Sequence, residues 1–245
     1  MAARSRNAGQ AKEKAGPVGD EWTDFGEEAA GTANPRDRVI RGVVRRLYEG
    51  QLEPGERLVE AQLTHDYEVS RGPVREALNR LAAMGVVDLM PQRGAKIRVL
   101  SLEEAIDSLV VVQGLVGMAA RLAAERIDGQ GEARLTSAID EVARFDQASP
   151  SADYALARDS FYSALVGIAG NSTLSRAMMP IDIHLIRIQF REALQMIDRR
   201  RHRDYVDIAE AVCAGNAKRA EKLAEAHLGR SIAALRTFGE DSGTA

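Results

Sequence analysis

The sequence predicts a mainly α protein in which an N-terminal winged helix-turn-helix precedes an all-α bundle of six or seven helices. Two observations lead to this fold class. Apolar residues recur every three or four positions through residues 35–81 and again from residue 102 to about residue 238, as amphipathic helices require. Between these stretches, β-prone runs at Val86–Met90 and Ala95–Val99 flank the turn Pro91-Gln92-Arg93-Gly94, which is typical of a hairpin.

The first two helices are predicted over Pro35–Gly50 and Leu58–Tyr67. Aliphatic residues lie on one side of the first helix, and its other side carries Arg38, Arg41, Arg45 and Arg46. Pro54-Gly55 suits the two central positions of a type II turn, so we expect a turn between the helices. Glu68-Val69 then forms a tight link to a third helix.

The third helix is predicted to begin at Ser70, because a serine hydroxyl is a good N-cap acceptor. Pro73 falls in the first turn, where its missing N–H is tolerated. The apolar stripe that should face a core consists of Val74, Ala77, Leu78 and Leu81. Arg71 and Arg75 are left at the exposed end, where guanidinium groups suit guanine edges or phosphates in a major groove. An ordinary surface helix with solvated arginines is the alternative for this segment taken alone.

Three helices followed by a hairpin form a winged helix-turn-helix, in which the tip of the wing lies beside the DNA duplex. The region resembles the GntR family of bacterial transcription regulators. The resemblance is carried by Ile40, Gly50, Pro54-Gly55-Glu56-Arg57-Leu58, Glu60, Leu63, Val69-Ser70-Arg71, Pro73-Val74-Arg75-Glu76-Ala77-Leu78, Leu81 and Gly85.

The resemblance implies that Arg71 and Arg75 contact the operator and that Arg93 and Gly94 reach the minor groove. Family members often carry Thr where this chain has Gly72, so one hydroxyl that could contact DNA is missing here. Ser70 is also predicted to contact DNA. Arg38 and Arg57 are candidate phosphate contacts, and such contacts would add affinity without specificity.

Length and composition favour two domains, since 245 residues with 45% apolar content can bury a substantial core. We expect a disordered tail over residues 1–34, the winged domain over 35–100, a helical domain over 101–238 and a C-terminal tail over 239–245. No apolar run approaches the ~18 residues that span a bilayer and no leader is evident, so a cytoplasmic protein without a membrane partner is expected. The single cysteine, Cys213, excludes an internal disulfide and a multi-cysteine zinc site.

The net charge of −3 is divided unevenly along the chain. Residues 35–100 contain twelve Arg and Lys against nine Asp and Glu, whereas residues 101–245 contain seventeen against twenty-one. Positive charge therefore gathers in the winged domain, which agrees with DNA as a partner.

The second domain is predicted to be entirely helical, with breaks at glycine, proline and asparagine positions. The expected helices are Leu102–Ile127, Glu132–Gln147, Ala152–Ala169, Thr173–Met196, Arg200–Ala214 and Ala217–Phe238. This arrangement resembles the FCD effector-binding domain of the FadR branch of the GntR family. The resemblance rests on the helix count and on the residues Ala119–Ala124, Phe161, Gly170-Asn171, Gly215 and His227.

Many members of that branch bind a divalent metal through one Asp and three His, and the corresponding positions here are Arg158, Tyr162, Tyr205 and His227. Only His227 is a good ligand, because a guanidinium repels a cation and neutral phenols bind metals poorly. Asp159 is one position away, turned about 100° around the helix, and is not counted as a substitute. We therefore expect no metal and no other cofactor; metal-dependent effector binding is the alternative.

The same cluster, together with His184, Arg187 and Arg191 on one predicted helix face, suits a small organic acid. A buried Arg can hold a carboxylate through two parallel hydrogen bonds, and Tyr can stack on a ring and donate from its hydroxyl. Alternatively, the arginines form salt bridges between helices or subunits and the tyrosines only fill the core.

We therefore expect a ligand-responsive transcription regulator, most often a repressor in this family, that binds a short palindrome as a homodimer. No catalytic arrangement of residues is evident, so we expect no enzyme activity. Two other classes remain open: a helical enzyme or small-molecule carrier, and a constitutive architectural DNA-binding protein.

Overall fold

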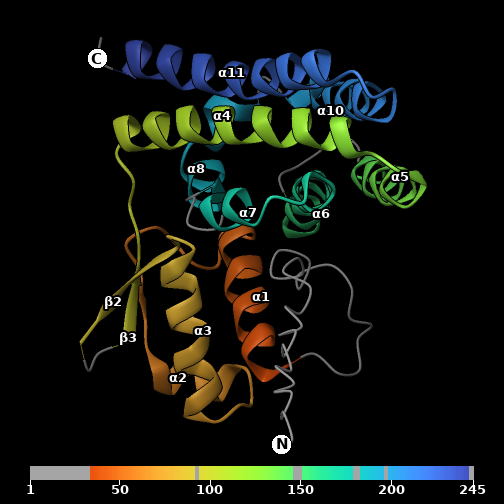
Figure 1. The fold of residues 1–245 in the computed structure, drawn as a ribbon. Coiled ribbons are helices and arrows are strands. Elements are labelled where there is room, and N and C mark those ends of the chain that lie inside the picture. Colours follow the sequence, from red (N-terminus) through yellow and green to blue (C-terminus); the bar gives the residue numbers. More distant parts are fainter. Residues whose placement is uncertain (1–33, 92–93, 146–150, 179–182, 196–197, 243–245) are drawn as a thin grey trace, which may run out of the picture.

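The computed structural model describes residues 34–91, 94–145, 151–178, 183–195 and 198–242. It has the predicted fold class, with a winged helix-turn-helix at one end and a helical bundle at the other (Figure 1). The predicted tail over residues 1–34 falls almost entirely outside the described residues, as does the wing-tip residue Arg93.

The winged domain contains three helices and a small antiparallel sheet. The helices are α1 (Pro35–Tyr48), α2 (Glu60–Asp66) and α3 (Arg71–Ala83), and the strands are β1 (Arg57–Leu58), β2 (Val87–Met90) and β3 (Gly94–Ile97), in the order β1-β3-β2. The apolar faces of α1 and α3 pack together, and the predicted stripe from Val74 to Leu81 is buried. The helix α2 also packs against α3, and a short turn joins the two, as a helix-turn-helix requires.

The sheet has one more strand than the hairpin predicted from the sequence. Gly55 has a φ of +88°, as the third position of a type II turn requires, and the turn directs the chain back along β3. The amide of Gly55 donates to the carbonyl of Ile97, and the amide of Ile97 donates to the carbonyl of Glu56. Leu58, which was predicted to begin the second helix, is instead buried in β1.

Ser70 occupies the N-cap position of α3, but its side chain makes no capping hydrogen bond. The predicted cap is therefore wrong in its chemistry. The third residue of the helix is Pro73, which has no N–H to donate to the Ser70 hydroxyl. Ser101 provides the contrast, because it begins the next helix with a complete capping box that includes Glu104.

The helical bundle has two long antiparallel helices above several shorter ones (Figure 1). In chain order the described helices are α4 (Leu102–Arg126), α5 (Gly129–Ala143), α6 (Ala152–Ala169), α7 (Ser172–Met178), α8 (Ile183–Gln189), α9 (Arg191–Gln195), α10 (Asp198–Cys213) and α11 (Ala217–Ser242). The helix predicted over Thr173–Met196 is thus three shorter helices, with residues 179–182 outside the described part of the chain.

The helix α4 is the central element of the bundle and packs most extensively against α11 and α6. It is 25 residues long, and an 18-residue window has a mean hydropathy of 1.5, so by length and composition alone it could cross a membrane. The expectation that no such run exists was therefore too strong. In the structure, one side of α4 forms the core of the bundle, which accounts for its apolar composition.

Candidate DNA-binding surface and ligand cavity

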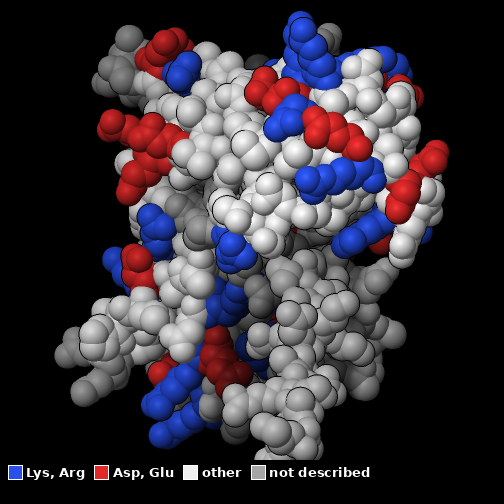
Figure 2. All heavy atoms as spheres, in the orientation of Figure 1, with Lys and Arg blue, Asp and Glu red and all other residues white. Residues whose placement is uncertain are grey.

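The exposed face of α3 carries the residues that the sequence assigned to DNA contact. Arg71, Gly72 and Arg75 are exposed, whereas Ala77 and Leu78 on the other face are buried. The Arg75 Nε lies 3.0 Å from the Glu60 carboxylate of α2, while the Arg75 side chain remains 65% exposed. Basic side chains gather at the end of the molecule where α2 and α3 meet (Figure 2).

Two glycines in this region have opposite surroundings. A Cβ at Gly72 would meet no atom within 4 Å, so the threonine typical of the family would fit there. A Cβ at Gly94 would collide with the backbone carbonyl of Leu58, and Gly94 has a φ of +87°. The pairing of β3 with β1 therefore requires glycine at position 94, whatever this residue does on DNA.

The remaining predicted DNA contacts lie at the edges of the α3 face. Arg38 is exposed on α1 and donates a 3.3 Å hydrogen bond to the backbone carbonyl of Glu68. Arg57 is exposed on β1, directly opposite the exposed Lys96 of β3. Lys96 was not among the residues predicted from the sequence, although its alternation with the buried Ala95 and Ile97 along β3 identifies it as outward-facing.

In the bundle, three of the four residues at the family's metal positions form a polar and aromatic cluster. His227 Nε2 lies 3.1 Å from the Tyr162 hydroxyl, and the Tyr205 ring centroid is 4.9 Å from that of His227. His227 Nδ1 lies 2.9 Å from the carboxylate of Asp204, which also pairs with Arg230. Burial alone would raise the pKa of Asp204, but its hydrogen bonds with His227 and Arg230 bring that pKa below its usual value.

Arg158, at the fourth position, is 5% exposed, and its guanidinium lies 4.6 Å from the centroid of the Tyr154 ring. It also interacts with Tyr205 and with Tyr48 of α1. Its charge therefore lies among aromatic residues of α6 itself, of α10 and of α1.

These residues do not fit a divalent metal. A guanidinium and two phenols occupy three of the positions, and both ring nitrogens of His227 are already hydrogen-bonded. Within the described part of the chain, no three His, Cys, Asp or Glu side chains come together as a metal site would need.

A cavity of about 40 Å³ lies beside this cluster, with room for about three water molecules. Its wall is mainly apolar, and the residues that line it are Val112, Val116, Asp159, Tyr162, Met178, Ile183, Arg187 and Leu228. Of the predicted effector residues, Tyr162 and Arg187 line this cavity and Arg158 is not in its wall. Asp159, which the sequence analysis set aside, is in the wall.

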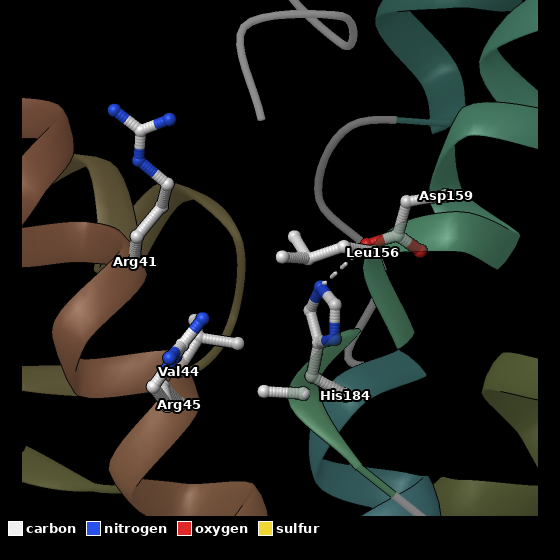
Figure 3. Close-up of a pocket in the computed structure, with 7 residues that line it drawn as sticks. Arg41, Val44, Arg45, Leu156, Asp159 and His184 are labelled. Carbon is white, nitrogen blue, oxygen red and sulfur yellow. Dashed lines mark ion pairs between the residues drawn. The ribbon is translucent and has the colours of Figure 1, made fainter. Parts of the chain in front are cut away.

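Asp159 also lies at the junction of the two domains, where α1 meets α6 and α8 (Figure 3). His184 Nε2 is 3.4 Å from the Asp159 carboxylate, and His184 Nδ1 is 3.1 Å from the Tyr48 hydroxyl. Arg191 donates a 3.2 Å hydrogen bond to the Tyr48 backbone carbonyl. Burial raises the pKa of the Tyr48 phenol, so Tyr48 remains a hydrogen-bond donor at neutral pH.

The predicted basic stripe of His184, Arg187 and Arg191 is therefore wrong in its geometry. The helix α8 ends at Gln189 and α9 begins at Arg191, so the three side chains do not share one continuous helix face. Arg187 lines the cavity, whereas His184 and Arg191 both hold Tyr48.

Models of known protein families match both domains of the chain. The model for bacterial regulatory proteins of the gntR family matches residues 35–97, and the FCD domain model matches residues 107–230, about half of the chain. The chain belongs to the GntR family. It is a DNA-binding transcription regulator of the FadR branch with a C-terminal FCD effector-binding domain, and it is not an enzyme.

This GntR regulator is similar to several proteins along most of its length. It is 28% identical over 200 residues to the HTH-type transcriptional regulator BphR of Paraburkholderia xenovorans, covering 79% of this chain and 82% of BphR. It is 24% identical over 191 residues to the transcriptional repressor GlaR of Escherichia coli, covering 74% and 87%. Its fold is similar to that of E. coli McbR/YncC, with a TM-score of 0.64 and 20% identity over 84% of this chain and 99% of that one.

Proposed function

We propose that this regulator is a ligand-responsive repressor that binds a short palindromic operator as a homodimer and takes a small organic acid as its effector. The observation that carries the ligand response is the position of α8. Arg187 of α8 lines the FCD cavity, while His184 of the same helix contacts Tyr48 of α1. A ligand that moves α8 would therefore act directly on the winged domain, and repression agrees with the names of matched relatives such as GlaR.

On DNA, we assign base contacts in the major groove to Arg71 and Arg75 and a minor-groove contact to the wing at Arg93 and Gly94. Ser70 supports this assignment, because its hydroxyl is not used in capping and is exposed beside Arg71. Arg38 and Arg57 would contact phosphates. The target of such a protein is the bacterial chromosome, so we place the regulator in the cytoplasm.

For the homodimer, we propose the exposed face of α4. Val110, Val111 and Met118 are 46%, 58% and 40% exposed, and Gly114 lies between them on the same side of the helix. Charged side chains lie near both ends of α4, and the surface over its middle is largely uncharged (Figure 2). An exposed apolar stripe of this kind is typical of a subunit interface, and a twofold axis across α4 would present two recognition helices to the two halves of a palindrome.

The effector proposal is tested by thermal unfolding in a panel of small carboxylic, hydroxy and amino acids at millimolar concentration. Ligands that bind the native protein raise its melting temperature. We expect at least one of these acids to do so in the wild type, and Arg187→Ala to abolish the response. Arg219→Ala on the surface of α11 is the matched control and should respond as the wild type does. An Arg187→Ala protein that responds fully would contradict the assignment.

The regulatory part of the proposal needs the operator itself. Duplexes selected from a random library with the wild-type protein should share a palindrome, and an acid that raises the melting temperature should change the affinity for that duplex. Val111→Glu should convert the dimer to a monomer in light scattering, and the monomer should bind a single half-site weakly. Selected duplexes without twofold symmetry would contradict the dimer.

A further inference from the structure

We infer that the effector carries an amino group beside its carboxylate, and that this amino group binds Asp159 in place of His184. The inference rests on the proposed effector cavity and specifies the class of ligand that the cavity takes. It comes from a residue that the metal positions of the family do not include.

The cavity wall contains side chains of opposite charge. Arg187 of α8 can hold a carboxylate, and Tyr162 can donate or accept a hydrogen bond. Asp159 of α6 lies in the same wall, where a ligand with only a carboxylate would meet a like charge in an apolar setting. A ligand with an ammonium group would instead gain an ion pair. The remaining wall, which includes Val112, Val116 and Leu228, suits an apolar side chain.

The surroundings of Asp159 leave its charge incompletely balanced. Its side chain is 19% exposed, and among the described residues it pairs with the His184 ring, whose Nε2 lies 3.4 Å away. Burial raises the pKa of Asp159, and the opposing effects of His184 and Arg158 do not restore the usual value. A further cation at this carboxylate would relieve the cost of burying the charge.

Binding at Asp159 would reach the winged domain through one side chain. His184 uses one ring nitrogen for Asp159 (Figure 3) and the other for the Tyr48 hydroxyl of α1. An ammonium group that takes the Asp159 carboxylate removes one of the two contacts that orient the His184 ring. The cavity of about 40 Å³ has room for only about three water molecules, so binding of an apolar amino acid also requires its wall to move. Ile183 and Arg187 of α8 belong to that wall, so a movement on their side would act on the contact between α8 and α1 as well.

The test compares pairs of probes that differ only in the amino group, by isothermal titration calorimetry with the full-length protein. The pairs are L-valine with 3-methylbutanoate, L-leucine with 4-methylpentanoate, and L-phenylalanine with 3-phenylpropanoate. We expect the amino acid of at least one pair to bind about ten- to a hundredfold more tightly than its partner, as a charged hydrogen bond in a buried site would give.

Asp159→Asn should remove this difference while leaving the binding of the deaminated acid unchanged or stronger. Asp107→Asn is the matched control, because Asp107 is exposed on α4, outside the cavity wall. The Asn variant keeps the shape of the side chain and removes a buried charge, so its melting temperature should not fall. The amino acid and the deaminated acid of each pair are also compared on the wild-type protein, and that comparison does not depend on whether a variant folds.

The outcomes separate this inference from the proposed function. If the deaminated acids bind the wild type as tightly as the amino acids or more tightly, the inference is wrong and the carboxylate cavity stands. If Asp159→Asn keeps the full preference for the amino acid, the assignment to Asp159 is wrong. If neither member of any pair binds, both the inference and an acid effector in this cavity are overturned.

Discussion

In the winged domain, Arg71 and Arg75 lie four residues apart on one helix and extend into solvent, whereas the polar side chains of the bundle come from distant parts of the chain and are buried. Tyr162 and His227 are 65 positions apart, and Tyr48 and His184 are 136 positions apart. The first arrangement is set by helical periodicity alone, and the second exists only once the bundle has formed. Substitutions in the two regions should therefore affect different properties.

His227→Ala should have the largest effect on stability. It removes the hydrogen bonds that His227 makes with the Tyr162 hydroxyl and the Asp204 carboxylate, and it opens a cavity beside Tyr205. We expect the free energy of unfolding to fall by about 2–4 kcal/mol, measured by urea denaturation. His65→Ala is the control, since His65 is exposed on α2 and should change stability by less than about 0.5 kcal/mol. If His227→Ala and His65→Ala lowered the free energy of unfolding equally, the expected difference between the bundle cluster and the exposed face of the winged domain would be wrong.

Arg75→Ala should leave the melting temperature unchanged and impair only DNA binding. Loss of a bidentate base contact should weaken binding to the selected operator by about ten- to a hundredfold, measured by fluorescence anisotropy at a fixed salt concentration. Binding to random duplex should weaken much less, so the ratio of the two affinities falls. Arg236→Ala on exposed α11 is the control. A parallel loss on both duplexes would mean that Arg75 contacts only phosphate.

Tyr48→Phe tests the residue that joins the two regions. It removes the hydroxyl that bonds to His184 but keeps the ring, so we expect a loss of about 1 kcal/mol in stability. Operator affinity without ligand should change little, while the effect of a bound acid on that affinity should shrink. Tyr67→Phe removes a buried hydroxyl within the winged domain and should not alter the ligand effect. An unchanged ligand effect in Tyr48→Phe would exclude this contact as the route between domains.

The pH dependence of unfolding should distinguish the partly buried carboxylates of Asp159 and Asp204, with the smallest effect of the series. The pKa of Asp204 is lowered in the folded protein, so its contribution to stability is present above its unfolded pKa of about 3.9 and is lost as pH falls through the folded value. The pKa of Asp159 is raised, so Asp159 opposes folding as pH rises through its folded value. Asp204→Asn should therefore flatten the acid side of the stability profile. Asp159→Asn should raise stability at neutral pH.

The sequence predicted best where local rules decide the structure. The spacing of Val74, Ala77, Leu78 and Leu81 correctly placed the buried face of α3, and the resemblance of the flanking residues identified the winged domain. It failed where two local rules compete at one place. Ser70 has the right side chain for a cap, but Pro73 removes one of the two N–H groups, that of the third helical residue, to which such a cap binds. Short strand β1 was also missed, because it exists only through pairing with β3.

The bundle was predicted in outline, and its cavity only in part. Tyr162, Tyr205 and His227 do come together, as alignment to the family positions implied. The helical angle of about 100° between Arg158 and Asp159 favoured Arg158, but Asp159 is the one of the two that lies in the cavity wall. Helical geometry fixes the direction in which a side chain leaves its helix, but only the neighbouring helices decide where a cavity lies. Residues of α7 and α8 place this one beside Asp159.

The link between Leu100 and Gln189 has a consequence for hybrid regulators. Leu100 follows the wing, and both its backbone N–H and its carbonyl bond to the Gln189 side chain, at 2.9 and 3.3 Å. The Gln189 amide thus satisfies both the N–H and the carbonyl of Leu100, as the backbone of a neighbouring strand would. A chimera that joins this winged domain to a foreign FCD domain at residue 100 would lose both bonds, together with the His184 and Arg191 contacts to Tyr48. Modular exchange of sensing domains should therefore succeed only when α8 and α9 are grafted with the winged domain, or when the acceptor carries equivalents of these three side chains.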